Sequence, residues 1–379
     1  MKKLGEVCCF CSGYTPKASE LKEKGAIPYF KVSDMNHQDN LKYLTHTFLF
    51  LEEGCKVYPK HTIVFPKNGA AIATNKKRIL KKDSVVDLNT GGVTANSSIV
   101  SHEYLYLYLL NIDFRQYTRG GAVPTLDLKE LKNKDIPLPS LPEQEKIVAE
   151  LDCLSGIIEK KKQQLKELDA LAQSIFYEMF GDPVENEKGW EVKNVGEVCE
   201  EKKAIIRANK FFKNDDVIQY IDIASVNNNI NIIESTTSFR FEDAPSRAQQ
   251  VVNYGDILIS LVRPNLRNIA VVQFNDNSLV ASSGFCVLRV GPNIDYLFLK
   301  HILLTDSFTT YLMDRVAGAN YPAVREEDIK KCSISVPPLS LQHSFASKVE
   351  AIEKQKELIK QSIAETELLF NSRMQYYFG

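Results

Sequence analysis

Apolar residues recur in alternating steps of four and three along two long segments of the chain. The first segment follows Pro142, and the second lies 198 residues further on. The stripe positions are Ile147, Leu151, Leu154, Ile158, Lys161, Leu165, Leu168, Ala172, Ile175 and Met179, and then Phe345, Val349, Ile352, Lys356, Ile359, Ile363, Thr366, Phe370, Arg373 and Tyr377. A 3.5-residue repeat predicts a coiled-coil seam. We expect two long helices, and the first, Glu143 to Phe180, would be about 57 Å long.

Each seam carries one lysine, Lys161 in the first segment and Lys356 in the second. A polar residue in a seam costs stability and fixes the register of the two helices. The helices could pair with another chain, but both seams lie on one chain, and effective concentration favours pairing within it. The pattern alone leaves parallel and antiparallel pairing open.

The chain between and before these segments repeats itself. IPYFKVSDMN from Ile27 recurs as IQYIDIASVN from Ile218, an offset of 191, while Pro124, Gln144 and Phe180 recur as Pro322, Gln342 and Phe378, an offset of 198. Short apolar runs such as HTIVFP and GDILIS predict buried strands. A short strand, a proline-rich turn and a helix occur together in IPLPSLPEQEKIV and in ISVPPLSLQHSFA. Each half is therefore predicted to be a strand-rich globular module followed by one long helix.

Composition adds limits rather than a function. The chain has 379 residues, 44% hydrophobic and 25% charged, with a net charge of −1. The segment MKKLGEVCCFCSG has no apolar signal-peptide core and no run approaches membrane-spanning length, so we expect a cytoplasmic protein. Cys8, Cys9 and Cys11 are too crowded for a zinc knuckle, and the six histidines show no ligand spacing. We expect structural thiols and no metal site.

Catalytic motifs are missing from the sequence. It contains no GxGxxG, GxxxxGK[ST], HExxH or GxSxG, and no [DN]PP[YFW] of base-flipping methyltransferases. The paired carboxylates look like solvated surface, because they do not recur in both halves. We therefore expect a protein without catalytic activity of its own.

The loops that follow the two buried strands differ between the halves. The first reads PKNGAAIATNKKR, and the second, LVRPNLRNIAVV, concentrates arginine and asparagine, the side chains that bind guanine and adenine edges. Later loops with glycine before proline could approach a phosphate. Solvated turns explain these loops, and the basic clusters around Lys77 and Lys203, about equally well. Our candidate DNA-binding residues are Lys67, Asn68, Asn75, Lys76, Arg78, Arg119, Arg263, Asn265, Arg267, Asn320 and Tyr321.

The whole chain resembles the specificity (S) subunits of type I DNA restriction–modification systems. The resemblance rests on GEVC followed by SGYTP, on IPYFKVSDM, on IPLPSLPEQEKIVAELD, on GDILISLVRPNLRN and FGDPVENEKGWEV, and on the two helical regions at equal spacing. The second half departs from the first, because EKKAIIRANK replaces the SGYTP turn. Two domains that read different half-sites would differ in this way.

The resemblance implies an α+β fold with two pseudo-repeated target-recognition domains and two long helices that form an antiparallel coiled coil. We expect the first target-recognition domain at residues 1–140, a central spacer helix at 141–181, a linker at 182–189, the second domain at 190–336 and a C-terminal spacer helix at 337–379. The seam residues that would also organise partner docking are Leu151, Leu154, Ile158, Leu165, Leu168, Val349, Ile352, Ile359 and Ile363.

The implied function is DNA recognition and scaffolding. Each half would read one half-site of a bipartite double-stranded DNA target, and the helices would set the gap and dock two methyltransferase (M) subunits, with restriction (R) subunits completing the complex. S-adenosylmethionine, ATP and Mg²⁺ would bind only to the partner subunits. Two rivals remain: a self-contained methyltransferase or nuclease, disfavoured by the missing motifs, and a coiled-coil adaptor without DNA binding, disfavoured by the loop chemistry.

Overall fold

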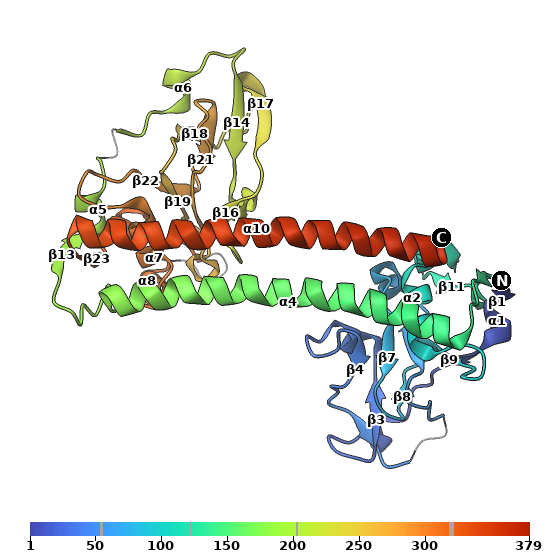
Figure 1. The fold of residues 1–379 in the computed structure, drawn as a ribbon. Coiled ribbons are helices and arrows are strands. Elements are labelled where there is room, and N and C mark those ends of the chain that lie inside the picture. Colours follow the sequence, from blue (N-terminus) through green and yellow to red (C-terminus); the bar gives the residue numbers. More distant parts are fainter. Residues whose placement is uncertain (54–55, 122, 202–203, 318–321) are drawn as a thin grey trace. The chain divides into compact units, whose positions relative to one another are not determined.

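The computed structural model describes residues 1–53, 56–121, 123–201, 204–317 and 322–379. The chain divides into two units. Unit 1 comprises Met1–Lys162 and Lys360–Gly379, and unit 2 comprises Gln163–Ile359. Each unit thus combines one globular domain with about half of each long helix (Figure 1).

The two long helices predicted from the heptads are present. Helix α4 spans Leu141–Phe180 and helix α10 spans Leu339–Phe378, each with 40 residues. Within each unit the two helices lie side by side and run in opposite directions (Figure 1), because later residues of α4 meet earlier residues of α10. Ion pairs between them include Glu150–Arg373 and Lys162–Glu367 in unit 1, and Asp169–Lys356 in unit 2.

The residues of the predicted seam are shielded from solvent to different degrees. Five of its residues are buried, and the other four are half-buried. The buried residues are Leu151, Ile158, Val349, Ile352 and Ile363, and the half-buried ones are Leu154, Leu165, Leu168 and Ile359. Leu151 packs into the core of unit 1, and Val349, its equivalent in the repeat, packs into the core of unit 2.

Unit 1 carries a mixed five-stranded sheet in the order β2-β9-β6-β7-β4 and a three-stranded sheet in the order β5-β3-β8. The strands are β1 Lys2–Lys3, β2 Cys8–Ser12, β3 Ile27–Phe30, β4 Tyr43–Leu44, β5 Phe50–Leu51, β6 Ile63–Pro66, β7 Arg78–Leu80, β8 Val85–Val86, β9 Thr90–Ala95, β10 Thr118–Arg119, β11 Thr125–Leu126 and β12 Asp135–Ile136. The short helices are α1 Leu4–Val7, η1 Ala18–Glu20, η2 Val32–Asn36, η3 Ala70–Thr74, α2 His102–Leu110, η4 Phe114–Tyr117 and α3 Leu128–Lys132.

Unit 2 carries a four-stranded sheet in the order β17-β14-β21-β18 and a three-stranded sheet in the order β20-β19-β22. The strands are β13 Glu191–Asn194, β14 Val217–Ile221, β15 Val226–Asn227, β16 Ile232–Ile233, β17 Thr237–Arg240, β18 Ala248–Val251, β19 Ile257–Ser260, β20 Ile269–Val271, β21 Leu279–Ser282, β22 Phe285–Leu288 and β23 Ser333–Val336. The short helices are α5 Val195–Val198, α6 Ala208–Phe211, η6 Ile223–Ser225, η7 Phe241–Asp243, η8 Pro264–Leu266, α7 Tyr296–Leu303, α8 Asp306–Met313 and α9 Glu326–Lys330.

The repeat in the sequence is a repeat in three dimensions. The strand at the start of each half pairs antiparallel with the strand just before the long helix, β1 with β12 and β13 with β23. The HTIVFP and GDILIS runs form strands β6 and β19, and YLYLYLL and YLFLKHILL form helices α2 and α7. These observations confirm the predicted α+β fold with two pseudo-repeated domains and two long antiparallel helices.

A buried glutamine joins each globular domain to the start of its long helix. Gln144 Oε1 accepts from the backbone N–H of Ser101, the N-cap of α2, and its Nε2 donates to the carbonyls of Ile99 and Pro139. Gln342 repeats this contact in unit 2: its Oε1 accepts from the N–H of Asp295, the N-cap of α7. Both side chains are fully buried. The recurring glutamine is therefore structural, since it satisfies backbone groups that burial would otherwise leave unpaired.

Each long helix ends against the domain that belongs to the other half of the sequence. Phe180 at the end of α4 lies in unit 2, 4.8 Å from Phe298 of α7 between ring centres. Phe378 at the end of α10 lies in unit 1, 5.2 Å from Tyr104 of α2. Edge-to-face packing of this kind adds to the burial of the rings. Each unit therefore contains the start of one long helix and the end of the other.

Candidate nucleic-acid interface

The arginine- and asparagine-rich loop of unit 2 is held in one defined conformation. It follows β19 and contains the single 3₁₀ turn η8 between Arg263 and Arg267. Both arginines have left-handed backbones, with φ of 51° and 50°. This conformation is uncommon outside glycine and persists only where neighbours impose it. The N–H of Arg263 donates to the carbonyl of Pro322 at 2.7 Å, which ties the loop to the segment that follows the glycine-containing loop.

A hairpin rich in asparagine supports this loop from the side. Strands β15 and β16 pair antiparallel, and residues 228–231 form the tip between them. Asn228 Nδ2 donates to the carbonyl of Leu266 at 3.0 Å, and Asn231 Nδ2 donates to that of Arg267 at 2.8 Å. Asn229 lies exposed between them. The two supporting amides keep the loop stiff, so that its outward side chains meet a partner without a large loss of conformational entropy.

The three candidate residues of this loop differ in their surroundings. Asn265 and Arg263 are exposed, whereas Arg267 is half-buried. The guanidinium of Arg267 donates to the carbonyl of Leu304 at 3.2 Å and forms an ion pair with Asp306. Arg267 therefore also anchors the loop to the start of α8. The exposed Asn265 is therefore better placed than Arg267 to reach a base edge.

A cavity of about 420 Å³ opens beside this loop inside unit 2. Its lining includes Asn228, Asn265 and four basic residues, Arg267, Lys300, His301 and Lys356. Burial lowers the pKa of Lys300, and it lowers that of His301 to about 4, so His301 is neutral at pH 7 and its Nδ1 pairs with the carbonyl of Leu297 at 2.8 Å. Burial also lowers the pKa of Lys356, but hydrogen bonds to Asp169 and Glu353 outweigh it and leave that pKa raised.

In unit 1 the candidate residues are dispersed, and several are engaged in the fold. The carbonyl oxygen of the Asn75 side chain accepts from the N–H of Phe114 at 2.9 Å and from Lys77 Nζ at 2.6 Å. Arg78 donates to the backbone carbonyls of Met35, Asn40 and Lys77. Both side chains thus hold neighbouring segments in place.

The remaining candidates of unit 1 lie nearer to solvent. Lys67 and Asn68 follow β6 and are half-buried, and burial lowers the pKa of Lys67. Lys76 Nζ contacts the side-chain oxygen of Asn36, and the exposed Arg119 forms an ion pair with the buried Asp127. Two candidates of the glycine-containing loop in the second half, Asn320 and Tyr321, lie outside the described residues.

The basic run at residues 76–78 needs a correction. We expected a solvated or phosphate-contacting cluster, but the side chain of Lys77 is fully buried. Its ammonium donates to Asn75 Oδ1 and to the carbonyl of Ile112, and it lies 4.1 Å from the ring centre of Phe114. Burial lowers its pKa to about 7. Lys77 therefore belongs to the interior of unit 1 and not to a surface that binds phosphate.

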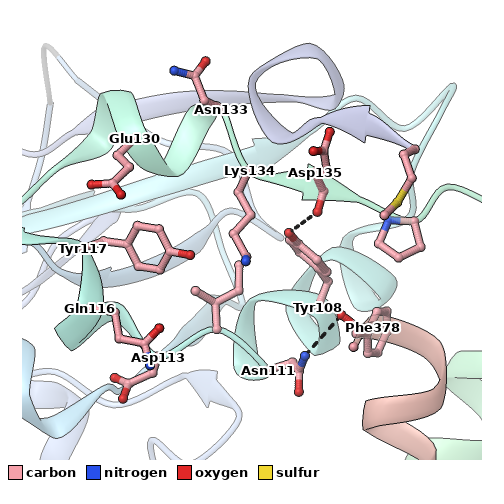
Figure 2. A pocket seen from close by; sticks show the side chains of 14 residues that line it. Tyr108, Asn111, Asp113, Gln116, Tyr117, Glu130, Asn133, Lys134, Asp135 and Phe378 are labelled. Atoms are coloured by element: carbon pink, nitrogen blue, oxygen red, sulfur yellow. Dashed lines mark hydrogen bonds between the residues drawn. The ribbon is translucent and has the colours of Figure 1, made fainter.

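A second cavity, about 620 Å³, lies in unit 1 beside the end of α10 (Figure 2). Tyr108 donates to the carbonyl of Asp135, and Asn111 donates to that of Phe378. Three carboxylates line it, Asp113, Glu130 and Asp135, against one lysine, Lys134. An acidic lining repels a phosphate backbone, so this cavity is not a candidate for the nucleic-acid interface.

The supporting asparagines of the hairpin were not among the residues predicted from the sequence. The run NNNIN at residues 227–231 was visible as a cluster of turn-forming amides. Its contact with residues 266 and 267 depends on the pairing of β15 with β16, which the sequence pattern does not reveal.

Comparison with known proteins points to one family across both halves. The model of the type I restriction modification DNA specificity domain matches residues 1–170 and again residues 187–368. The MjaIX type I specificity subunit of Methanocaldococcus jannaschii is 24% identical over 93% of this chain and 85% of its own length. The MjaVIII specificity subunit of the same organism is 26% identical over 78% of this chain and 74% of its own length.

Solved structures share the fold. The type I restriction–modification S subunit of M. genitalium superposes with a TM-score of 0.54 at 13% identity and covers 100% of this chain and 95% of its own. A chain from a structural study of complex assembly and conformational transition in a type I system superposes with a TM-score of 0.58 at 19% identity, over 100% and 96% of the two chains. Among the described residues, every helix is too short or too polar to cross a membrane.

Proposed function

Because this chain belongs to the type I restriction–modification DNA specificity family, we propose that it selects the DNA target of such a system and reads a bipartite sequence, one half-site with each target-recognition domain. The first domain is the globular part of unit 1, and the second is the globular part of unit 2. The chain is the specificity subunit, and the M and R subunits carry out methylation and cleavage.

The observation that carries this proposal is the stiffened loop of the second domain. Asn265 and Arg263 are exposed on a loop whose backbone is fixed by Pro322, Asn228 and Asn231. Asparagine binds adenine and arginine binds guanine through paired hydrogen bonds in the major groove. The corresponding loop of the first domain has a different sequence and different internal contacts. Two domains on one framework, with unlike loops, suit a target with two unlike halves.

The long helices are proposed to dock the partner subunits and to set the gap between the half-sites. In unit 1, Leu368 and Tyr376 of α10 are 72% and 76% exposed, and in unit 2 Leu358 of the same helix is 61% exposed. Large apolar side chains left on a helix surface mark a place for another protein. We propose that two M subunits bind there, and that R subunits join that assembly.

Cofactors belong, in this proposal, to the partners. S-adenosylmethionine would bind to the M subunits, and ATP and Mg²⁺ would serve the complete complex through subunits other than this one. The sequence carries no nucleotide-binding or methyltransferase motif, which supports a specificity subunit without catalytic activity of its own.

Methylome sequencing tests this function. The chain would be expressed with its M subunits in a host that lacks other type I systems, and methylated adenines would be mapped by single-molecule sequencing. We expect one motif made of two specific blocks separated by unspecified bases. Omitting this chain should abolish methylation at that motif. A continuous motif, or methylation by the M subunits alone, would contradict the proposal.

A paired insertion tests the role of the helices. Seven residues added after Lys162 in α4 and seven before Lys360 in α10 keep the heptad phase in both helices. Each helix then lengthens by about 10 Å. If the helices set the gap, the unspecified spacer should grow by about three base pairs, at 3.4 Å each. An insertion in α4 alone is the control, because it breaks the register and should abolish assembly.

A further inference from the structure

Two histidines and an aspartate gather on one loop of the first domain. One ligand atom from each of His37, Asp39 and His46 lies within 4.8 Å of the others. His37 Nδ1 and Asp39 Oδ2 lie 3.6 Å apart. The two imidazole rings stack with their centres 4.1 Å apart, and Phe48 packs edge-on against His46 at 4.7 Å.

The surroundings of His46 point to a ligand. Its Nε2 atom is buried and makes no hydrogen bond within the described structure. A buried polar atom without a partner is costly, and native proteins rarely keep one without a reason. His46 belongs to the same cluster as His37 and Asp39, whose side chains are 32% and 59% exposed. An ion arriving from solvent can therefore reach the cluster.

One buried amide fixes the loop that carries the three side chains. Asn40 is fully buried, and its Oδ1 accepts from the N–H groups of Thr45 and His46 at 2.8 and 2.9 Å. Its Nδ2 donates to the carbonyls of Asp34 and His46 at 2.9 and 2.8 Å. The single side chain of Asn40 thus joins the segment before His37 to the segment at His46. This organises the backbone of the cluster before any ligand binds.

We propose that His37, Asp39 and His46 form a binding site for a divalent transition-metal ion of the Zn²⁺ class. Two imidazoles and one carboxylate suit Zn²⁺, Co²⁺ or Ni²⁺, whereas Mg²⁺ and Ca²⁺ prefer oxygen ligands. Three protein ligands leave a fourth position for water or an outside donor. The spacing H-x-D-x₆-H matches no standard zinc motif, which is why the sequence predicted no site.

Binding requires a small change in the side chains. Ligand atoms around a tetrahedral Zn²⁺ lie about 3.4 Å apart, given bonds of about 2.0–2.1 Å. The stacked imidazoles have nearly parallel planes, 19° apart, so their lone pairs must be turned toward one point. His37 and Asp39 can make this rotation because both reach solvent, while the backbone held by Asn40 stays in place. The ion would then cross-link residues 37 and 46.

The site adjoins a candidate DNA-binding residue. Lys76 Nζ contacts the side chain of Asn36, the residue before His37, and Arg78 donates to the carbonyl of Asn40 inside the loop. A bound cation would add positive charge to this part of the first domain and rigidify it. The metal site itself does not depend on DNA binding, and its test needs no DNA.

Cobalt titration of the full chain tests the site. After treatment with a chelator, wild-type protein is titrated with Co²⁺, and the bound metal is counted by elemental analysis. We expect one ion with visible d–d absorption and without the near-ultraviolet charge-transfer band of thiolate ligands, which separates this site from the cysteines. His46→Asn and Asp39→Asn each remove a proposed ligand, so each should weaken binding by at least the about 10–100-fold that loss of a hydrogen-bond partner of a ligand costs. Mg²⁺ should not compete.

Matched controls keep the outcome clear. His343→Asn removes an exposed histidine of α10 outside the cluster and should bind Co²⁺ as the wild type does. Zn²⁺ should raise the melting temperature of the wild type and of His343→Asn but not of His46→Asn, because only a binding-competent native state is stabilised by the ion. Asp39 is on the surface, so its variant tests the site without risk to the core. Equal Co²⁺ uptake by the wild type, His46→Asn and Asp39→Asn would overturn the proposal, and so would a thiolate band.

Discussion

Unit 1 and unit 2 share a joint between domain and helix, yet they bury different charges. Gln144 and Gln342 accept from the N-cap residue of α2 and of α7 in the same way. In the interior of unit 1, the buried ammonium of Lys77 donates to neutral oxygens. In unit 2, Arg289 forms a two-bond ion pair with the buried Asp256, at 2.9 and 2.7 Å.

This difference separates the residues that hold the fold together from those that we expect to determine specificity. The joint must hold a long helix in both units, so its polar contacts and its seam residues recur. The loops after β6 and β19 do not share that task and have diverged, as two domains reading different half-sites require. Where the two units agree, the residues are therefore expected to act on stability, and where they differ, on specificity.

The largest expected loss of stability comes from substitutions in the seam, at two positions that the repeat relates. Leu151→Glu and Val349→Glu each place a carboxylate in a buried apolar site, which should lower the free energy of unfolding by about 3–5 kcal/mol. Leu368→Glu is the control, because Leu368 is largely exposed on the same pair of helices, and it should change stability by under about 0.5 kcal/mol.

Chemical denaturation of the full chain measures these changes, and amide hydrogen exchange assigns them to a unit. Leu151→Glu should open unit 1 first, and Val349→Glu should open unit 2 first. If only one of the two substitutions lowered the free energy of unfolding, the seam would not stabilise the two units in the same way. A destabilised Leu368→Glu variant would mean that α10 is covered at that position.

The second largest loss of stability is expected from replacing the two buried glutamines that join each globular domain to its long helix. Gln144→Ala leaves the N–H of Ser101 and the carbonyls of Ile99 and Pro139 without their partner, and Gln342→Ala does the same to the N–H of Asp295. Each substitution should cost about 2–3 kcal/mol, since a buried unpaired group costs about 1–3 kcal/mol. Denaturation should give similar losses for both. A loss in one unit alone would show that water replaces the amide in the other.

The recurring residues could be predicted from the sequence for a physical reason. A heptad helix and its joint depend on local periodicity and on constant spacing, which is why the helix, the seam and the position of Gln144 and Gln342 could be found without coordinates. The role of the glutamines still needed the fold, because the N–H groups they satisfy lie 43 and 47 residues away.

The diverged regions resisted prediction because they depend on contacts distant in sequence. Lys76, Lys77 and Arg78 look alike as a basic run, but Lys77 is buried by Ile112 and Phe114. The loop at Arg263 is stiffened by a hairpin that lies more than thirty residues earlier. His37 and His46 come together only through the turn that Asn40 closes. Pattern and spacing do not encode such contacts.

The third expected effect is on DNA specificity. It tests the loop after β19, which differs from the loop after β6. Asn265→Ala should weaken binding to the cognate target by about 1–3 kcal/mol if Asn265 contacts a base, and should relax only the second half-site. Asn229→Ala, on the exposed tip of the supporting hairpin, is the companion variant. Methylome sequencing and equilibrium binding at fixed salt measure both. If Asn265→Ala weakened binding to all sequences equally, the contact would be to phosphate.

The last effect tests the buried charge of unit 1 through pH. Burial lowers the pKa of Lys77 from 10.5 to about 7 in the folded chain. Below pH 7 the lysine is charged in both states, and folding carries the full cost of burying the ammonium. Between about pH 7 and 10.5 the unfolded chain binds more protons than the folded one, so the contribution of Lys77 to stability becomes more favourable as pH rises.

The slope in that window is at most about 1.4 kcal/mol per pH unit. Lys77→Met removes the titrating group, so the difference in free energy of unfolding between wild type and variant should shift by about that amount for each unit between pH 7 and 9, always in favour of the wild type. Arg289→Met in unit 2 is the counterpart: arginine stays protonated throughout this range, and hydrogen bonds to Asp256 raise its pKa further. The loss of unfolding free energy that Arg289→Met causes should therefore stay constant with pH in this range. A flat difference for Lys77→Met as well would mean that the ammonium of Lys77 keeps its proton in the folded chain, and that the two units bury charge on equal terms after all.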